Sequence, residues 1–372
     1  MELEKRQHGL DLIKTLGLYL VILYHVLYPY MPDVVTAPNA VDYLRYFLET
    51  FLACCVPLFF MSSGALALKK PTDLRKNTMR CVHLGIIMVI WVFLALGGML
   101  LIRRQWLGWS EFFAIAWELR IGYIQHLWFL PCFLFLCLMT PVLSALKFRA
   151  PQIYRYLMLL MTVLTFGDLL LNDGAYVIRW AMGEADGRTW DRSFFWYVNF
   201  FGIYYWYSLV YYALGDWLLS HGSALPIKKG QLVAVIPVCM ALVFLSAMAR
   251  SRVGLVTYNH VYYNYSNIFV LVIASAVFLL LQNVKLGAVA QRLTASLAQC
   301  SLGIYVLHWL VLEALRQLWP GLMAKTALFP IVSLGILVVT WGIVLLGKKI
   351  PVIRGLFTTA SPKKKNTVEK TA

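Results

Sequence analysis

Apolar runs of about 20 residues recur along almost the whole chain, and they leave few folds open to it. Mean hydropathy is +0.71. Only 13% of the 372 residues are charged, compared with about 25% in soluble domains. A helix needs about 20 apolar residues to cross ~30 Å of hydrocarbon, and lipid offers no partner to an unpaired backbone group. The sequence therefore predicts an all-α polytopic membrane protein.

We expect about ten transmembrane helices. More of the 33 Lys and Arg residues fall in connections on the N-terminal side than on the other side, which predicts that both termini are cytoplasmic. Residues 1–350 are expected to form a single transmembrane domain, and the basic segment 351–372 a disordered cytoplasmic tail. The predicted spans lie near 10–29, 47–68, 83–102, 124–146, 154–171, 195–219, 231–249, 266–283, 297–318 and 327–347.

The charge and cysteine content exclude two common classes of protein. The net charge of +16 is what a cytoplasmic face opposite anionic headgroups requires, so it gives no case for nucleic-acid binding. The cysteines lie in apolar runs without metal-ligand spacing, so we interpret them as packing residues rather than disulfide or metal ligands. There are 7 of them: Cys54, Cys55, Cys81, Cys132, Cys137, Cys239 and Cys300.

The first apolar segment, GLDLIKTLGLYLVILYHVL, carries three ionisable side chains: Asp11, Lys14 and His25. A charge at mid-bilayer costs at least ~2.5 kcal/mol, so such residues indicate a functional site. His25 follows Lys14 by 11 residues, which is about three helical turns and roughly 16 Å of rise on nearly the same face. One face of this helix is therefore expected to line a polar interior, with Asp11 and Lys14 toward the cytoplasm and His25 toward the outside.

Two further histidines fall at the depth of His25. In the predicted topology His126 begins the fourth span on its outer side, and His308 lies in the outer half of the ninth. Imidazole suits general base catalysis near neutral pH. A single membrane histidine is as often a packing residue, but three at one depth favour a site.

Other segments offer binding surfaces whose composition also has a plain explanation. The loop KKPTDLRKNTMR contains Arg75, Lys76 and Arg80 and suits the phosphates of a nucleotide, although the positive-inside rule alone also places cations there. The outer segments 172–194 and 250–265 are rich in aromatic, amide and charged residues. They suit contact with a sugar, or simply a solvated loop with interfacial aromatic residues.

Four motifs in order give the chain a family resemblance from about residue 7 to 347. They are LDLIKTLGLYLVILYH in the first span, VPLFFMSSGALAL in the second, HLWFLPCFLFLCLMTPVL in the fourth and SLGIYVLHWLVL in the ninth. The chain thereby resembles the membrane-bound acyltransferase-3 family. Since no fused extracellular domain is expected after the last span, it looks most like the stand-alone type that O-acetylates enterobacterial common antigen.

The resemblance implies a multi-pass enzyme of the bacterial inner membrane. It implies transfer of an acyl group, usually acetyl, from cytoplasmic acyl-coenzyme A to a hydroxyl of an extracytoplasmic glycan or lipid-linked saccharide, with no permanently bound cofactor. By the same resemblance His25 is the expected base, Lys14 its basic companion, and Arg75, Lys76 and Arg80 the donor contacts. Lys14 stands where most members have arginine.

We add Asp11 and His308 to the candidate catalytic residues, and His126, Trp128 and Tyr305 to the candidate substrate-binding residues. Transfer can be direct or can pass through an acylated histidine. The alternative function is a transmembrane carrier or exporter of a small polar molecule or polysaccharide, because ten spans with buried charges also suit transport.

Overall fold

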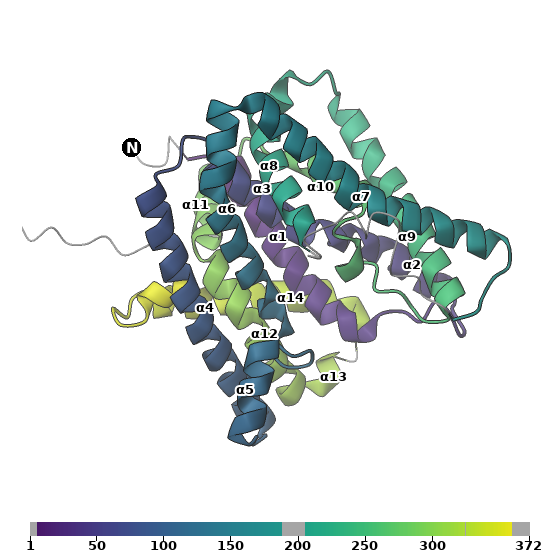
Figure 1. The fold of residues 1–372 in the computed structure, drawn as a ribbon. Helices are drawn as coiled ribbons and strands as arrows, with labels where there is room; N and C mark the ends of the chain where they lie inside the picture. The colour runs from purple at the N-terminus through teal and green to yellow at the C-terminus, as the bar shows by residue number, and fades with distance from the viewer. Residues whose placement is uncertain (1–5, 188–204, 324, 359–372) are drawn as a thin grey trace, which may run out of the picture.

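The computed structural model describes residues 6–187, 205–323 and 325–358, which form helices and connecting segments without any strand (Figure 1). The predicted all-α class is confirmed for these ranges. The longer helices are α1 (His8–Leu27), α2 (Ala40–Glu49), α3 (Cys55–Ala67), α4 (Leu74–Arg103), α5 (Trp109–Glu118), α6 (Phe129–Arg149), α7 (Pro151–Ala181), α8 (Trp206–His221), α9 (Lys229–Gly254), α10 (Ile268–Leu281), α11 (Ala288–Gln299), α12 (Ser301–Leu318) and α14 (Phe329–Gly347). Shorter ones include η2 (Thr50–Cys54), η3 (Gln125–Trp128), η6 (Tyr262–Asn264), α13 (Pro320–Met323) and η8 (Arg354–Phe357).

Seven helical segments in the described part of the chain are long and apolar enough to cross a membrane. The pair α11 and α12, which is bent by 74° at Cys300, meets the same criterion only when taken together, as a broken span or a re-entrant segment. The other two predicted spans, 195–219 and 266–283, overlap α8 and α10, which are described over 16 and 14 residues. Residues 195–204, the start of the first of these two, lie outside the described part. The protein is therefore a multi-pass membrane protein with seven or eight helical segments that are long and apolar enough to span, within the described ranges.

Helix α1 runs through the middle of the bundle, in contact with α3, α10, α11, α12 and α14 (Figure 1). Ile13, Leu18 and Ile22 are fully buried on it. A helix surrounded by other helices can carry polar side chains without exposing them to lipid, because they face protein or a cavity. This central position explains how the first span accommodates Lys14 and His25.

Helices α3 and α8 approach closely because each presents a glycine to the other. A Cβ on Gly64 would lie 1.8 Å from the carbonyl oxygen of Tyr212, and one on Gly215 would lie 2.0 Å from that of Met61. Small residues allow such contact between membrane helices, where van der Waals packing drives association. Gly64 closes the Ser-Gly motif of the second predicted span, so that motif has a packing role.

We expect Gly215→Ala to destabilise the fold by about 1–3 kcal/mol, since a Cβ forces the backbones of α3 and α8 apart. The measurement is thermal unfolding of the purified protein in detergent. Gly97→Ala is the matched control, because a Cβ at Gly97 of α4 meets no atom within 4 Å. Equal unfolding temperatures for the two variants would contradict close packing at Gly215.

The predicted outer loop 172–194 begins later than the sequence indicated, because α7 continues to Ala181. Asp173 on α7 accepts from Arg250 Nε of α9 at 2.6 Å and from Asn267 Nδ2 at 2.8 Å. These partners stabilise the charge of Asp173 within a helix. From composition alone, Asp173 is assigned to a loop. Residues 188–194 lie outside the described part.

The loop predicted at 250–265 is also shorter at its start, since α9 extends to Gly254. At the C-terminal end, residues 351–358 pack against the helices. Phe357 is buried, and Trp91 Nε1 donates to the Leu356 carbonyl at 2.9 Å. The remaining residues expected in the tail, 359–372, lie outside the described part.

Candidate active site

Two cavities lie along α1, one beside Lys14 and the other beside His25. The Lys14 cavity has a volume of about 440 Å³ and the His25 cavity about 560 Å³. Each has room for part of a large ligand. Lys14 and His25, which the sequence placed on one helix face, therefore open onto different cavities.

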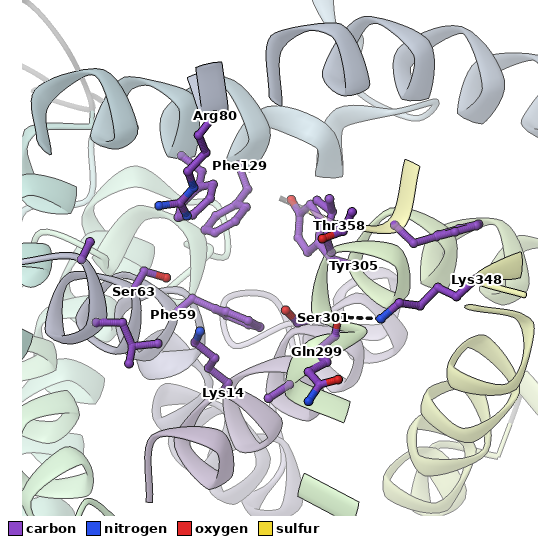
Figure 2. Close-up of a pocket in the computed structure, with 16 residues that line it drawn as sticks. Lys14, Phe59, Ser63, Arg80, Phe129, Gln299, Ser301, Tyr305, Lys348 and Thr358 are labelled. Carbon is purple, nitrogen blue, oxygen red and sulfur yellow. Dashed lines mark hydrogen bonds between the residues drawn. The ribbon is translucent and has the colours of Figure 1, made fainter. Parts of the chain in front are cut away.

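The Lys14 cavity is lined by cations and lacks a carboxylate among its described lining residues. Lys14 of α1, Arg80 of α4 and Lys348 after α14 contribute their side chains to it. Figure 2 shows Lys14 and Arg80 entering from different sides, with Lys348 bonded to the Gln299 carbonyl. Three cations and no acid make this cavity suited to an anionic ligand such as a phosphate ester.

Of the three predicted donor contacts, only Arg80 reaches the cavity. Arg75 and Lys76 are exposed on the first turn of α4 and do not line it. Lys76 pairs with Asp73 at 3.2 Å, and its backbone N–H and ammonium hold the pKa of Asp73 below its usual value. Arg75 and Arg80 are 5 residues apart, or about 140° around the helix, so they face different directions.

Lys348 is a cavity residue that the sequence analysis missed. Its Nζ donates to the Gln299 carbonyl at 3.3 Å and lies 3.8 Å from Cys300 Sγ. Its only signal in the sequence was membership of the basic segment after the last span. The positive-inside rule explains such a segment equally well.

The His25 cavity has a different chemistry. Aromatic rings surround His25 and His126, and Glu118 is its only described lining residue that carries a formal charge at neutral pH. Trp128 stacks on Tyr205 at 5.3 Å and on Tyr265 at 6.0 Å between ring centroids. The aromatic lining residues are Tyr24, Tyr28, Trp128, Phe135, Tyr205, Tyr262, Tyr263, Tyr265 and Tyr305, and Asn259 and Gln125 add amides. Flat rings with hydroxyls and amides suit an uncharged polar ligand such as a sugar.

The structure brings together the three histidines that the predicted topology placed at one depth. The ring of His308 lies 5.3 Å from that of His25 and 5.5 Å from that of His126, between centroids. Trp309 packs against His25 at 4.9 Å and stacks on His126 at 5.4 Å. Within the described ranges no group of His, Cys, Asp and Glu is arranged to hold a metal ion.

Hydrogen bonds indicate the tautomers of two of these histidines. His126 Nε2 lies 3.3 Å from the Val306 carbonyl, and His308 Nδ1 bonds to the Tyr305 carbonyl. A carbonyl can only accept, so each of these ring nitrogens carries the hydrogen. The opposite nitrogens, His126 Nδ1 and His308 Nε2, are buried without a hydrogen-bond partner. Both rings therefore keep a lone pair directed into the protein interior.

Tyr305 is shared by the two cavities. It lines both of them, and its hydroxyl donates to the backbone carbonyl of His126. This bond joins α12 to η3 at the place where the cavities approach each other. Trp128 lines only the His25 cavity, and His308 is fully buried behind the lining residues of both.

Asp11 and Arg316 hold the two ends of α1. Asp11 is buried and accepts two bonds from Arg6, at 2.5 and 3.0 Å, and lines neither cavity. Arg316 Nη2 donates to the backbone carbonyl of His25 at 3.1 Å. Glu313 accepts from Arg103 at 2.7 Å and lies 3.7 Å from Arg316. Sequence reasoning missed Arg316 because its partner lies 291 residues away.

The chain is thus a bundle of apolar membrane helices with a cationic cavity and an aromatic, histidine-lined cavity that share Tyr305. A family model described as an acyltransferase domain matches residues 7–347. The chain therefore belongs to the acyltransferase-3 family, as the four motifs predicted. No curated protein and no solved structure matches the chain.

Proposed function

We propose that this acyltransferase moves an acyl group, acetyl in the first instance, from acyl-coenzyme A to a hydroxyl of a glycan or glycolipid on the other side of the membrane. The observation that carries the proposal is the pair of cavities that share Tyr305. One is cationic and the other is aromatic with histidines. These are the chemistries that a nucleotide thioester and a sugar require.

In this proposal the Lys14 cavity opens to the cytoplasm and takes the donor. Coenzyme A carries several phosphates, and Lys14, Arg80 and Lys348 supply cations for them. The pantetheine arm then extends along α1 past Tyr305. Its length is roughly half of the ~30 Å hydrocarbon core, so the thioester reaches the depth of His25.

His25 is the proposed general base. It removes the proton of the acceptor hydroxyl while the oxygen attacks the thioester carbon. A carbon–oxygen bond forms and the carbon–sulfur bond breaks. The proton returns from His25 to the departing thiolate, which restores the neutral ring. His308 and Trp309 pack on His25 and fix its orientation.

The acceptor enters the His25 cavity, where Trp128 and its tyrosine neighbours stack on sugar faces. We place the protein in a bacterial inner membrane with both termini in the cytoplasm and ten crossings. A repeat-unit sugar of the enterobacterial common antigen type is the acceptor class that the family resemblance favours. Residues 1–350 act as one transmembrane domain.

The proposal is tested in proteoliposomes that contain glycolipids extracted from a bacterial strain lacking the gene. Labelled acetyl-coenzyme A, which does not cross a bilayer, is added outside. We expect label to appear in the glycolipid as an alkali-labile ester. Absence of any labelled ester, together with movement of a polar solute that needs no acyl-coenzyme A, would instead establish a carrier.

A further inference from the structure

Helix α5 is a short amphipathic helix with three distinct faces. Phe112, Ile115 and Ala116 turn toward the protein, and Ile115 and Ala116 are buried. Residues four apart lie about 40° apart on a helix, so Trp109, Phe113 and Trp117 share a second face. A third face carries Glu111 and Glu118, both of them exposed, while Ser110 borders the aromatic face next to Trp117.

The aromatic face is uncovered in the structure. Trp109 is 78% exposed, Phe113 54% and Trp117 90%, and Trp106 just before the helix is 90% exposed. Exposed apolar patches of this kind mark contact with a membrane or another protein. The chemistry of the neighbouring surface decides between the two.

That neighbouring surface is the lipid-facing side of α4. Helix α5 lies beside the end of α4 at the periphery of the bundle (Figure 1). Phe93 of α4 packs on Phe112 and Phe113 at 6.1 and 6.0 Å between ring centroids. Leu94 and Leu101 of α4 are exposed as well. The aromatic face is therefore continuous with a helix surface that faces lipid.

Tryptophan prefers the headgroup layer, because its ring is apolar and its N–H is polar. A helix with one apolar aromatic face and one acidic face can lie in that layer, with the first face toward lipid and the second toward water. Arg103 and Arg104 end α4 at the same place. This is where a spanning helix leaves the hydrocarbon.

The C-terminal end of α5 borders the mouth of the His25 cavity. Glu118, Leu119 and Ile121 line that cavity, and Ile121 is 80% exposed. If α5 lies in the headgroup layer, then the cavity opens at headgroup depth. A saccharide held at the membrane surface by its own lipid reaches such an opening directly.

We infer that α5 is an interfacial membrane helix, and that it makes the His25 cavity select an acceptor whose saccharide is anchored to lipid in that leaflet. The depth of α5 is independent of the enzyme's activity. The acceptor class rests on the proposed function. Two experiments separate these parts.

The first experiment measures depth. All seven cysteines are buried, so a nitroxide label attaches selectively to a single new exposed cysteine. Trp109→Cys and Trp117→Cys test the aromatic face, and Glu111→Cys and Glu118→Cys are matched controls on the acidic face. In liposomes we expect oxygen to reach labels at 109 and 117 and a water-soluble nickel chelate to reach those at 111 and 118. Equal access to the chelate at all four positions, or immobilisation of the labels at 109 and 117 by a protein contact, would overturn the inference.

The second experiment compares two forms of one acceptor. Glycolipids from the strain lacking the gene are used intact, or as the same glycans released from lipid by mild acid. We expect Trp109→Ser/Trp117→Ser to lose roughly tenfold in kcat/KM on intact glycolipid, since buried apolar area sets interfacial binding. The rate on released glycan should stay within about twofold, because neither tryptophan lines the Lys14 cavity or the His25 cavity.

Equal kcat/KM on the two forms with wild-type protein would overturn the inference while leaving acyl transfer intact. So would equal losses on both forms in the double variant. Failure to acylate either form, with the labels of the first experiment at the expected depth, would count against the proposed function and leave the interfacial position of α5 standing.

Discussion

Replacing His25 by alanine is expected to reduce acyl transfer by about 10²–10⁴-fold, the usual contribution of a positioned general base. His25 lines the acceptor-side cavity and contacts His308 and Trp309. Without its imidazole the acceptor hydroxyl has no base to take its proton. The assay measures transfer of labelled acetyl in proteoliposomes at saturating donor. We expect the loss to appear in kcat and not in the KM for acetyl-coenzyme A.

His221→Ala is the matched control. His221 is an exposed histidine at the end of α8, bonded to the Trp217 carbonyl at 3.1 Å. We expect it to keep the wild-type rate. His25→Asn retains a polar side chain at the same place and separates catalysis from folding, since it should unfold like wild type and remain inactive. Transfer by His25→Asn at more than about a tenth of the wild-type rate would remove His25 from the role of base.

Much of this architecture follows from local sequence. The apolar runs placed the helices because the bilayer fixes the length of a span. The spacing of charges on the first span placed Lys14 and His25 at different depths. Depth alone then put His25, His126 and His308 at one level, and the ring distances confirm that they come together.

The remainder depends on contacts between distant segments, which no local pattern encodes. Lys348 enters the Lys14 cavity only because the end of α14 packs against the junction of α11 and α12. Arg316 reaches the His25 carbonyl from α12. Asp11 was a candidate catalytic residue on the first span, but it accepts its two side-chain hydrogen bonds from Arg6, and it lines neither cavity. The boundary of α7 was misjudged because Asp173 is stabilised by Arg250, a residue of another helix.

The second large effect is expected at the cationic cavity. Arg80→Gln and Lys348→Gln should each raise the KM for acetyl-coenzyme A about tenfold, since a hydrogen bond to a charged group is worth about 1.5–3 kcal/mol. The kcat at saturating donor should change little, because neither residue lines the His25 cavity. The measurement is initial rate against donor concentration in the liposome assay.

Arg75→Gln is the matched control, as it removes an equal charge from the same helix. Arg75 is exposed and lines neither cavity, so its KM should stay within about twofold of wild type, as for other surface substitutions. A non-specific effect of net charge near the membrane would raise the KM equally in all three variants. That result would mean that the donor phosphates do not bind in the Lys14 cavity, because position inside the cavity is the property that Arg80 and Lys348 share and Arg75 lacks.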